Sequence, residues 1–463
     1  TNEFFAFPLN ANTIIMLDFL KMRSFVSVLL IGIICGNDLK NELKRISMKH
    51  ENEQRNIMNK MNDIRKMLDD ELCNNNGFYY DDIDACYCFT CFIGDNCQTL
   101  QDNCTILDTN GNPKLFEYYW REQSGMESTE AVYYRSPYQF GVSMLNEYIN
   151  NHTNNPYYGQ LLPVLSQKIL KLHSIVGNIK NSNRKNIVIG HGASNLIAAA
   201  EYACKQLYGV GRDMYVFAQV PYYDGYTADL TNGVYNGLSF SKSLSLKNDT
   251  VIEFVTVPNN PDNKYREPYY KNAACTIYDD VYLWPSITNL ADMNTPLESE
   301  ISLFSMSKLT GHAGTRFGWA LLDNPKLANK MSEYIYATEI SISIDAQYRA
   351  FTLFDYLTTD NNANDFFNWV KSQMTPRWTS LNTIFNPNTQ NRFIQHAKSG
   401  GFYAWIECIL PSETHNCASV FESVGVQPIP GSSFGATNAF VRMEIVTAKP
   451  VWDLIVQRLQ TLV

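Results

Sequence analysis

The stretch SMSKLTGHAGTRFGWA, residues 305–320, places Lys308 directly after two closely spaced serines and follows it with glycines, a histidine and Arg316. On frequency alone, a lysine among small residues is a solvated surface charge. The apolar runs on either side, ISLF (301–304) and RFGWALL (316–322), instead predict strands of a buried sheet. Lys308 would then stand just beyond the end of a strand, which makes it a candidate functional residue.

Short apolar runs rich in β-branched and aromatic residues recur along the middle of the chain and predict further strands. Residues 193–209 have the apolar spacing of a helix that Gly209 ends. Strands alternating with helices predict a mostly parallel α/β sheet covered on both faces, in which ligands bind at the carboxyl ends of the strands. Residues 347–463 mix both patterns and predict a second, smaller domain. The further strands are NIVIG (186–190), MYVFAQV (214–220), VIEFVTV (251–257) and CTIYDD (275–280).

The composition is that of a globular chain. Its 463 residues, 45% hydrophobic and 18% charged, suffice for two or three domains, or for one large α/β unit with a small appendage. The net charge of -9 provides no basic surface for a nucleic acid. Nucleic-acid binding is therefore not expected.

The N-terminal segment carries a predicted export signal. MRSFVSVLLIGIICG (22–36) has the basic start, apolar run and small-residue end of a secretory signal peptide; a buried strand or an uncleaved membrane anchor is the alternative. Residues 37–72 follow, with apolar residues at three- and four-residue steps, and predict an amphipathic helix. Three glycosylation sequons fit a secretory route: Asn103, Asn151 and Asn248.

Six of the eleven cysteines cluster at positions 73, 86, 88, 91, 97 and 104. Such a cluster forms either a disulfide-stapled module or a zinc site. Zinc favours paired C-x2-C knuckles, and only Cys88 and Cys91 have that spacing. Because a secretory route also favours disulfides, the cluster predicts a disulfide-rich module.

Four loops after predicted strands carry groups suited to one cofactor. GHGAS (190–194) joins a strand to a helix and could hold a phosphate. VPNNPDN (257–263) supplies asparagines in what is by default a turn, and PYYDGY (221–226) supplies aromatic rings. YDDVY (278–282) supplies two carboxylates, one of them expected to be a cap or a solvated charge. With Lys308, these groups meet the needs of pyridoxal phosphate: a lysine for its Schiff base, a carboxylate for its ring nitrogen, and donors for its phosphate and phenolate oxygens.

The chain resembles the plant-type alliinase family of pyridoxal-phosphate carbon–sulfur lyases, which includes the tryptophan aminotransferase-related enzymes. The resemblance covers residues 73–463 and rests on SKLTGHAGTRFGWA, IVIGHGASNLIAAA, PNNPD and IYDDVYLWP, which occur in that family's order. It implies the α/β fold of type I pyridoxal-phosphate-dependent transferases, with a large parallel-sheet cofactor domain (105–345) and a smaller α+β domain (346–463).

The cysteine spacing, followed by LFEYYW, is similar to the EGF-like module (here 73–104) that precedes the catalytic part of alliinases. This resemblance implies three disulfides in the module and suggests one more near the C-terminus. The implied pairs are Cys73–Cys86, Cys88–Cys97, Cys91–Cys104 and Cys408–Cys417.

The resemblance also implies a role for each candidate site residue. Lys308 would be the Schiff-base lysine and general base, and Asp279 would partner the pyridinium nitrogen. Arg442 would bind the substrate carboxylate, a task that suits its planar fork. Asn260 and Tyr282 would bond the phenolate oxygen. The other cofactor contacts would be Tyr223, stacked on the ring, and a phosphate set of His191, Gly192, Ala193, Ser194, Ser305, Arg316 and, from the neighbouring subunit of a homodimer, Tyr138.

Three departures from the family pattern concern substrate specificity and phosphate geometry. Asp280 replaces a residue that is usually histidine, and Asn263 replaces the usual glycine. GAS (192–194) replaces the customary threonine-containing loop. None of the three removes a cofactor contact outright.

The implied reaction is α,β-elimination on S-alkyl-cysteine sulfoxides, giving a sulfenic acid, pyruvate and ammonia. Transamination of tryptophan or another aromatic amino acid is the alternative, since both reactions begin with removal of the Cα proton. The EGF-like module and the secretory start favour the lyase. A secreted binding protein with an inactive large domain is a third hypothesis, and retention of the whole residue set counts against it.

Partners and location follow from the same resemblance. We expect a small amino-acid substrate, a homodimer with shared active sites, and no nucleic-acid partner. We expect no membrane partner after signal cleavage, and a location in the secretory pathway, either extracellular or in a vacuole-like compartment.

Overall fold

The structure is a computed structural model that describes residues 72–80, 85–108, 113, 115–122, 163–179, 186–227, 230, 237–288, 300–385, 392–409 and 416–463. The predicted signal peptide, all but the last residue of the predicted helix 37–72, Asn151 and Tyr138 lie outside these residues. Among the described residues, no helix is both long enough and apolar enough to cross a membrane.

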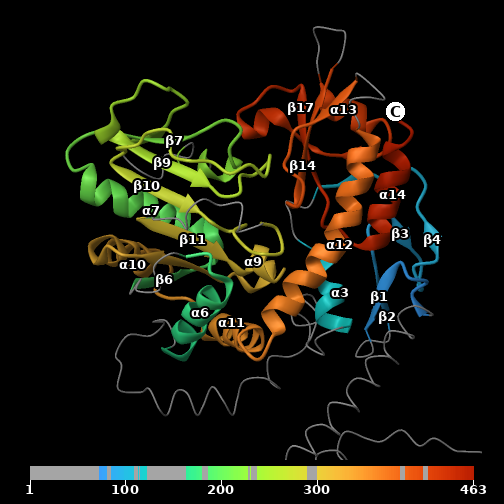
Figure 1. Ribbon diagram of the computed structural model, residues 1–463, viewed down its shortest axis with the longest axis horizontal. Helices are drawn as coiled ribbons and strands as arrows, with labels where there is room; N and C mark the ends of the chain where they lie inside the picture. The colour runs from blue at the N-terminus through green and yellow to red at the C-terminus, as the bar shows by residue number, and fades with distance from the viewer. Residues whose placement is uncertain are drawn as a thin grey trace, which may run out of the picture. The chain divides into compact units, whose positions relative to one another are not determined.

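A seven-stranded mixed sheet forms the core of the large domain (Figure 1). β12 (Gly318–Leu322) runs antiparallel to both of its neighbours, β6 (Asn186–Gly190) and β11 (Ile301–Ser305). The remaining pairs, from β11 through β10, β9 and β7 to β8, are parallel. Every residue of β9, β11 and β12 is buried, as expected for strands covered on both faces. The order is β6 (Asn186–Gly190), β12 (Gly318–Leu322), β11 (Ile301–Ser305), β10 (Cys275–Asp279), β9 (Val251–Thr256), β7 (Met214–Ala218) and β8 (Leu238–Phe240).

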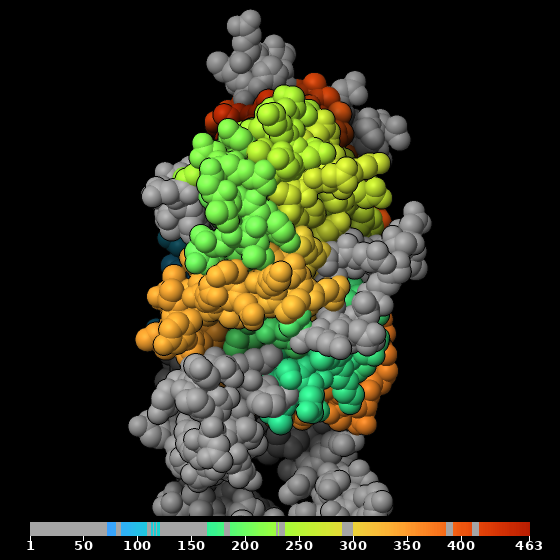
Figure 2. All heavy atoms as spheres, turned by 90° about the vertical axis from the view of Figure 1, so that its left-hand side faces the viewer, coloured from blue at the N-terminus to red at the C-terminus, as the bar shows by residue number. Residues whose placement is uncertain are grey.

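The predicted helix after β6 is α7 (Gly192–Tyr208), which packs on β11 and β12 and against α10 (Pro325–Glu339). Leu196, Ala199, Ala200 and Ala203 lie on its buried face, the spacing of an amphipathic helix on a sheet. α7 ends at Gly209, whose N–H donates to the Lys205 carbonyl. Figure 2 shows the face on which α7 (green) and α10 (orange) lie. α6 (Pro163–Val176) packs against α11 (Ile344–Leu357).

A second, four-stranded sheet lies in the C-terminal part of the chain. Its strand pairs are antiparallel. Arg377 of α12 (Asn362–Ile384) donates to the carbonyls of Ile445 and Thr447, which follow β17 (Phe440–Glu444). Cys408 and Cys417 form the disulfide that the resemblance suggests. The strand order is β13 (Phe393–Gln395), β14 (Tyr403–Cys408), β17 (Phe440–Glu444) and β16 (Ile429–Pro430), and the helices are α12 (Asn362–Ile384), α13 (Cys417–Glu422) and α14 (Lys449–Leu459).

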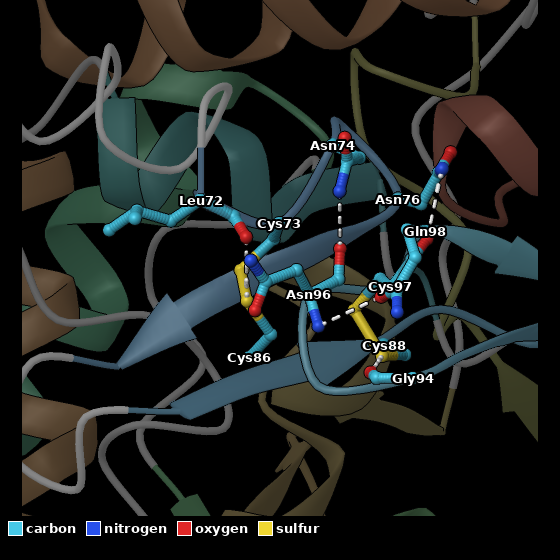
Figure 3. Close-up of a disulfide and its surroundings, with 10 residues drawn as sticks. All are labelled: Leu72, Cys73, Asn74, Asn76, Cys86, Cys88, Gly94, Asn96, Cys97 and Gln98. Atoms are coloured by element: carbon cyan, nitrogen blue, oxygen red, sulfur yellow. Dashed lines mark hydrogen bonds between the residues drawn. A yellow bond between two sulfur atoms is a disulfide. The ribbon is translucent and has the colours of Figure 1, made fainter.

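The clustered cysteines form the three disulfides that the resemblance implies: Cys73–Cys86, Cys88–Cys97 and Cys91–Cys104. Two short antiparallel pairs make up the rest of this module: β1 (Gly77–Tyr80) with β2 (Ala85–Cys88), and β3 (Phe92–Ile93) with β4 (Thr99–Leu100). Figure 3 shows the first two disulfides and the side-chain amides of Asn74 and Asn76, which donate to the carbonyls of Asn96 and Cys97.

The chain leaves the module through β5 (Ile106–Leu107), which pairs in parallel with β15 (Val426–Gln427). α3 (Leu115–Glu122) follows, and its Trp120 is fully buried, with the indole N–H donating to the Thr310 carbonyl. The segment that follows the module is therefore hydrogen-bonded to β15 and to Thr310, two residues after Lys308.

One disulfide was not predicted from the sequence. Cys204 on α7 is bonded to Cys275, the first residue of β10, and both cysteines are buried. The bridge ties the helix that begins at the GHGAS loop to the strand that ends at Asp279.

Removal of this bridge by Cys204→Ala with Cys275→Ala should lower the free energy of unfolding by about 4 kcal/mol, because the cross-link closes a long loop in the unfolded chain. The Cys408→Ala, Cys417→Ala protein is the control: its loop spans 9 residues instead of 71, and it should lose roughly 2.5 kcal/mol. Urea titration followed by circular dichroism measures both. Equal losses would contradict the loop-length argument.

Candidate active site

A cavity of about 500 Å³ lies where the strands of the large sheet end. Its lining includes the last residues of β10 and β11, together with residues that follow β6, β7 and β9. This is where ligands bind in open α/β sheets. The predicted site residues that line the cavity are Ala193, Ser194, Tyr223, Asn260, Asp279, Tyr282, Ser305, Lys308 and Arg316.

Lys308 lies on a single helical turn, α9 (Met306–Leu309), which starts where β11 ends. Ser305 caps this turn, its hydroxyl accepting from the Ser307 N–H at 3.2 Å. Burial lowers the pKa of Lys308 to about 8; Glu444 opposes the shift and Arg442 adds to it. The Lys308 Nζ is 5.9 Å from the centre of the Tyr282 ring. A lysine with such a pKa is a competent nucleophile and general base near neutral pH.

Asp279 ends β10 and is buried. Its Oδ2 accepts from the Tyr226 hydroxyl at 2.7 Å, whereas its Oδ1 has no hydrogen-bond partner among the described residues. Burial raises the pKa of Asp279 to about 6, against the Tyr226 hydrogen bond that lowers it. A buried carboxylate oxygen without a donor is suited to a cationic N–H. Tyr226, which stacks on Phe254 with ring centres 4.3 Å apart, was not among the predicted residues although it lies in PYYDGY.

The turn from β6 into α7 forms the predicted phosphate end of the cavity. Gly192 has φ +78°, and a Cβ there would lie 2.7 Å from Nη2 of Arg316. That nitrogen donates to the His191 carbonyl at 3.0 Å, so the arginine and the N-terminus of α7 are held together. His191 and Gly192 are not among the lining residues, and the imidazole of His191 lies 3.8 Å from the Glu339 carboxylate. The contact of His191 with a lining residue is made by its backbone carbonyl, which accepts from Arg316.

On the other side of the cavity, the polar ends of two predicted residues meet. Nδ2 of Asn260 is 3.5 Å from the Tyr282 hydroxyl, as expected for a pair that shares one acceptor oxygen. The Tyr282 hydroxyl lies 2.9 Å from that of Tyr403, a buried residue of β14 that the sequence did not single out. Tyr223 packs tightly over Gly225, where a Cβ would lie 2.3 Å from its ring.

Arg442, on β17, is buried beside this pair. Its Nη1 donates to Oδ1 of Asn260 at 3.1 Å, and its Nη2 is 3.0 Å from Oδ1 of Asp108. The rings of Tyr403 and Phe434 pack against the guanidinium, with centres 4.2 and 4.9 Å from Cζ. Arg442 is not among the lining residues and reaches the cavity through Asn260.

Two of the residues that depart from the family pattern, Asp280 and Asn263, are buried and contribute to the fold. Asp280 is 1% exposed and Asp279 is also buried, so neither carboxylate of YDDVY is a solvated charge, and that part of the expectation is wrong. The backbone N–H of Asp280 donates to the Leu303 carbonyl, which continues the strand pairing and draws the residue inside. Asn263, at φ 53°, donates from Nδ2 to the carbonyls of Lys398 and Tyr403. It thus joins the loop after β9 to the segment that leads into β14.

These residues fit pyridoxal phosphate. The buried Asp279 oxygen suits the ring nitrogen, the glycine turn and Arg316 suit the phosphate, and the Lys308 amine suits the aldehyde carbon. Fold and cavity together define a pyridoxal-phosphate-dependent enzyme of the aminotransferase fold.

The comparisons agree with this class. A methionine aminotransferase of Escherichia coli has a similar fold, with a TM-score of 0.52 and 17% identity over 69% of this chain and 90% of that one. Tryptophan aminotransferase-related protein 3 of Arabidopsis thaliana is 32% identical over 82% of this chain and 83% of its own length. An alliin lyase of Allium cepa var. aggregatum is 25% identical over 84% and 88%, respectively.

The family model described as "Allinase" matches residues 107–463. The chain therefore belongs to the alliinase family, and its cofactor is pyridoxal phosphate.

Asp279→Asn should weaken cofactor binding by about 100-fold or more, because the ring nitrogen loses its buried counter-charge. Titration of the apoprotein with pyridoxal phosphate, followed by absorbance, measures the dissociation constant. Tyr226→Phe is the control: it keeps the carboxylate and loses one hydrogen bond, so we expect a loss of about threefold to tenfold. An Asp279→Asn protein that binds as tightly as the wild type would assign the ring nitrogen to another group.

The rate at which the apoprotein captures pyridoxal phosphate should rise about tenfold per pH unit and level off above about pH 8, because only the neutral amine attacks the aldehyde. The fold lowers the Lys308 pKa from 10.5 to about 8 and so populates the neutral amine at a lower pH. Stopped-flow absorbance gives the profile, with Lys330→Ala as an exposed-lysine control. A midpoint near pH 10 would mean that Lys308 titrates as if in water.

Proposed function

We propose that this chain is a carbon–sulfur lyase that performs α,β-elimination on S-alkyl-cysteine sulfoxides, releasing a sulfenic acid, pyruvate and ammonia. The observation that carries the choice is the three-disulfide module directly before the catalytic part. The sequence resemblance associates this module with alliinases. The similarity to an alliin lyase over 84% of the chain supports the same reaction.

The site residues divide the work. Arg442 would hold the substrate carboxylate, a bidentate task for its fork. Lys308, with its lowered pKa, would take the proton from Cα and hold it within the cavity. Asp279 would stay ionised above about pH 6 and so keep a proton on the nitrogen beside it. The cofactor, when bound, supplies an electron sink that makes this Cα proton acidic.

Aminotransfer is the second candidate, and a specific observation favours it. Tryptophan aminotransferase-related protein 3 is more similar in sequence to this chain than the alliin lyase is, 32% against 25% identity. In this reaction Lys308 would take up the same Cα proton and deliver it again, with no group leaving from Cβ, so the same residues would serve both outcomes.

The disulfides also support the proposed location. Five bridges within the described residues are typical of an oxidising compartment. We therefore propose a secretory-pathway protein, extracellular or in a vacuole-like compartment. Of the predicted glycosylation sites, Asn103 and Asn248 are exposed. A homodimer that shares its active sites through Tyr138 is part of the same proposal.

A product assay separates the two reactions. The cofactor-loaded protein with S-methyl-cysteine sulfoxide, and no keto acid, should release pyruvate steadily, and Lys308→Ala should lower the rate by at least about 1000-fold. Lys330→Ala serves as the matched control. An absence of pyruvate, together with a new amino acid when tryptophan and a 2-oxo acid are supplied, would assign the chain to the aminotransferases. A colourless protein that takes up no cofactor would support the binding-protein hypothesis.

A further inference from the structure

Asp108 faces the arginine that the proposed function assigns to the substrate carboxylate. Its two carboxylate oxygens lie 3.0 Å from Nη2 and 3.4 Å from Nε of Arg442, so Asp108 meets one edge of the guanidinium. Nη1, on the other side, donates to Asn260, which lines the cavity. A carboxylate that approaches from the cavity therefore meets Arg442 on the side away from Asp108.

The pair is deeply buried: the side chains of Arg442 and Asp108 are 1% and 2% exposed. With Tyr403 and Phe434 packed on the guanidinium, Asp108 fixes its rotation about the Cδ–Nε bond. Bidentate geometry of this kind confers direction as well as energy. A buried arginine without its carboxylate would carry an uncompensated charge and shift toward another acceptor.

Asp108 and Arg442 are both held to one short segment, residues 425–430. Asp108 donates its backbone N–H to the Gln427 carbonyl at 3.2 Å, and Ile106 donates to Gly425 at 2.9 Å, within the β5–β15 pair. Ile429 of β16 lies opposite Arg442 of β17. The distance between the two side chains is therefore set by backbone pairing on both sides.

The disulfide module reaches this segment through Cys104. Cys104 is bonded to Cys91 of the module, and its carbonyl accepts from Nη1 of Arg458 at 2.8 Å. The same nitrogen donates to Gly425 at 2.7 Å. Arg458, on α14, thus links Cys104, the last cysteine of the module, to Gly425, which directly precedes β15. Cys104 lies four residues before Asp108 in the chain.

We propose that Asp108 is a positioning residue that orients Arg442 for the substrate carboxylate, and that the disulfide module holds Asp108 in place through Cys104. The inference rests on the proposed role of Arg442 but not on the choice between lyase and aminotransferase. It gives the module a part in substrate binding.

The test uses two ligands that differ only in the carboxylate. L-Alanine and L-alaninamide are titrated into the full, cofactor-loaded chain, and the shift in cofactor absorbance gives a dissociation constant for each. The wild type should prefer the acid by at least about tenfold, since a charge-assisted bidentate contact is lost in the amide. Asp108→Asn should reduce this preference by about tenfold through weaker binding of the acid, with the amide unchanged, because a guanidinium at the wrong angle loses part of its charge-assisted bidentate contact.

Arg442→Lys distinguishes the two possible failures. If Arg442→Lys keeps the preference for the acid, the proposed carboxylate site is wrong. If Arg442→Lys loses the preference while Asp108→Asn keeps it, the positioning role of Asp108 is wrong. If Asp108→Asn binds L-alanine more tightly than the wild type, Asp108 competes with the ligand, which also overturns the proposal.

The part played by the module has a matched control. Cys91→Ala with Cys104→Ala should lower the preference for the acid, as should Arg458→Gln, which acts on the same contact from α14. Cys73→Ala with Cys86→Ala removes a bridge of the same sequence separation, 13 residues, and should leave the preference unchanged. If the two double variants behave alike, the module has no specific link to Arg442. Arg458→Gln decides the question if Cys91→Ala with Cys104→Ala does not fold.

Discussion

The site depends on the burial of charged groups at the carboxyl edge of the large sheet. Asp279, Arg442 and Asp108 are nearly inaccessible to water, and an ion removed from water needs a partner. Arg442 and Asp108 satisfy each other. Asp279 is satisfied at one oxygen only. Desolvation lowers the pKa of Lys308 and so favours its neutral amine. The fold thus leaves an acceptor for a cationic ring and a reactive amine in the same cavity.

Much of the large domain could be predicted because its strands are mostly apolar. β9, β11 and β12 are buried on both faces, so each stands out as a continuous run in the sequence. The end of α7 at Gly209 could also be predicted, because a glycine follows the last residue of the helical pattern. β8 was missed because it has only three residues and one of them, Ser239, is exposed, so it has no apolar run.

The loops that follow strands could be assigned to the site, since parallel strands bring their carboxyl ends together. The residues that the sequence did not single out reach the site through contacts between distant parts of the chain, which no local sequence pattern predicts. Tyr403 meets Tyr282 across 121 residues, and Asp108 meets Arg442 across 334. The burial of Asp280 also depends on a tertiary contact, the hydrogen bond to Leu303. In the sequence its carboxylate resembles any acidic residue at the end of a strand.

The Cys204–Cys275 bridge bears on how the protein should be produced. It is buried and spans the segment that contains Tyr223 and Asn260, so the walls of the cavity assemble around a bond that a reducing cytosol does not form. A bacterial cytosol would yield a chain in which the GHGAS helix and the Asp279 strand lack their covalent tie. The yellow colour of a preparation would then report on oxidation as much as on cofactor supply, and export to the periplasm is the better expression route.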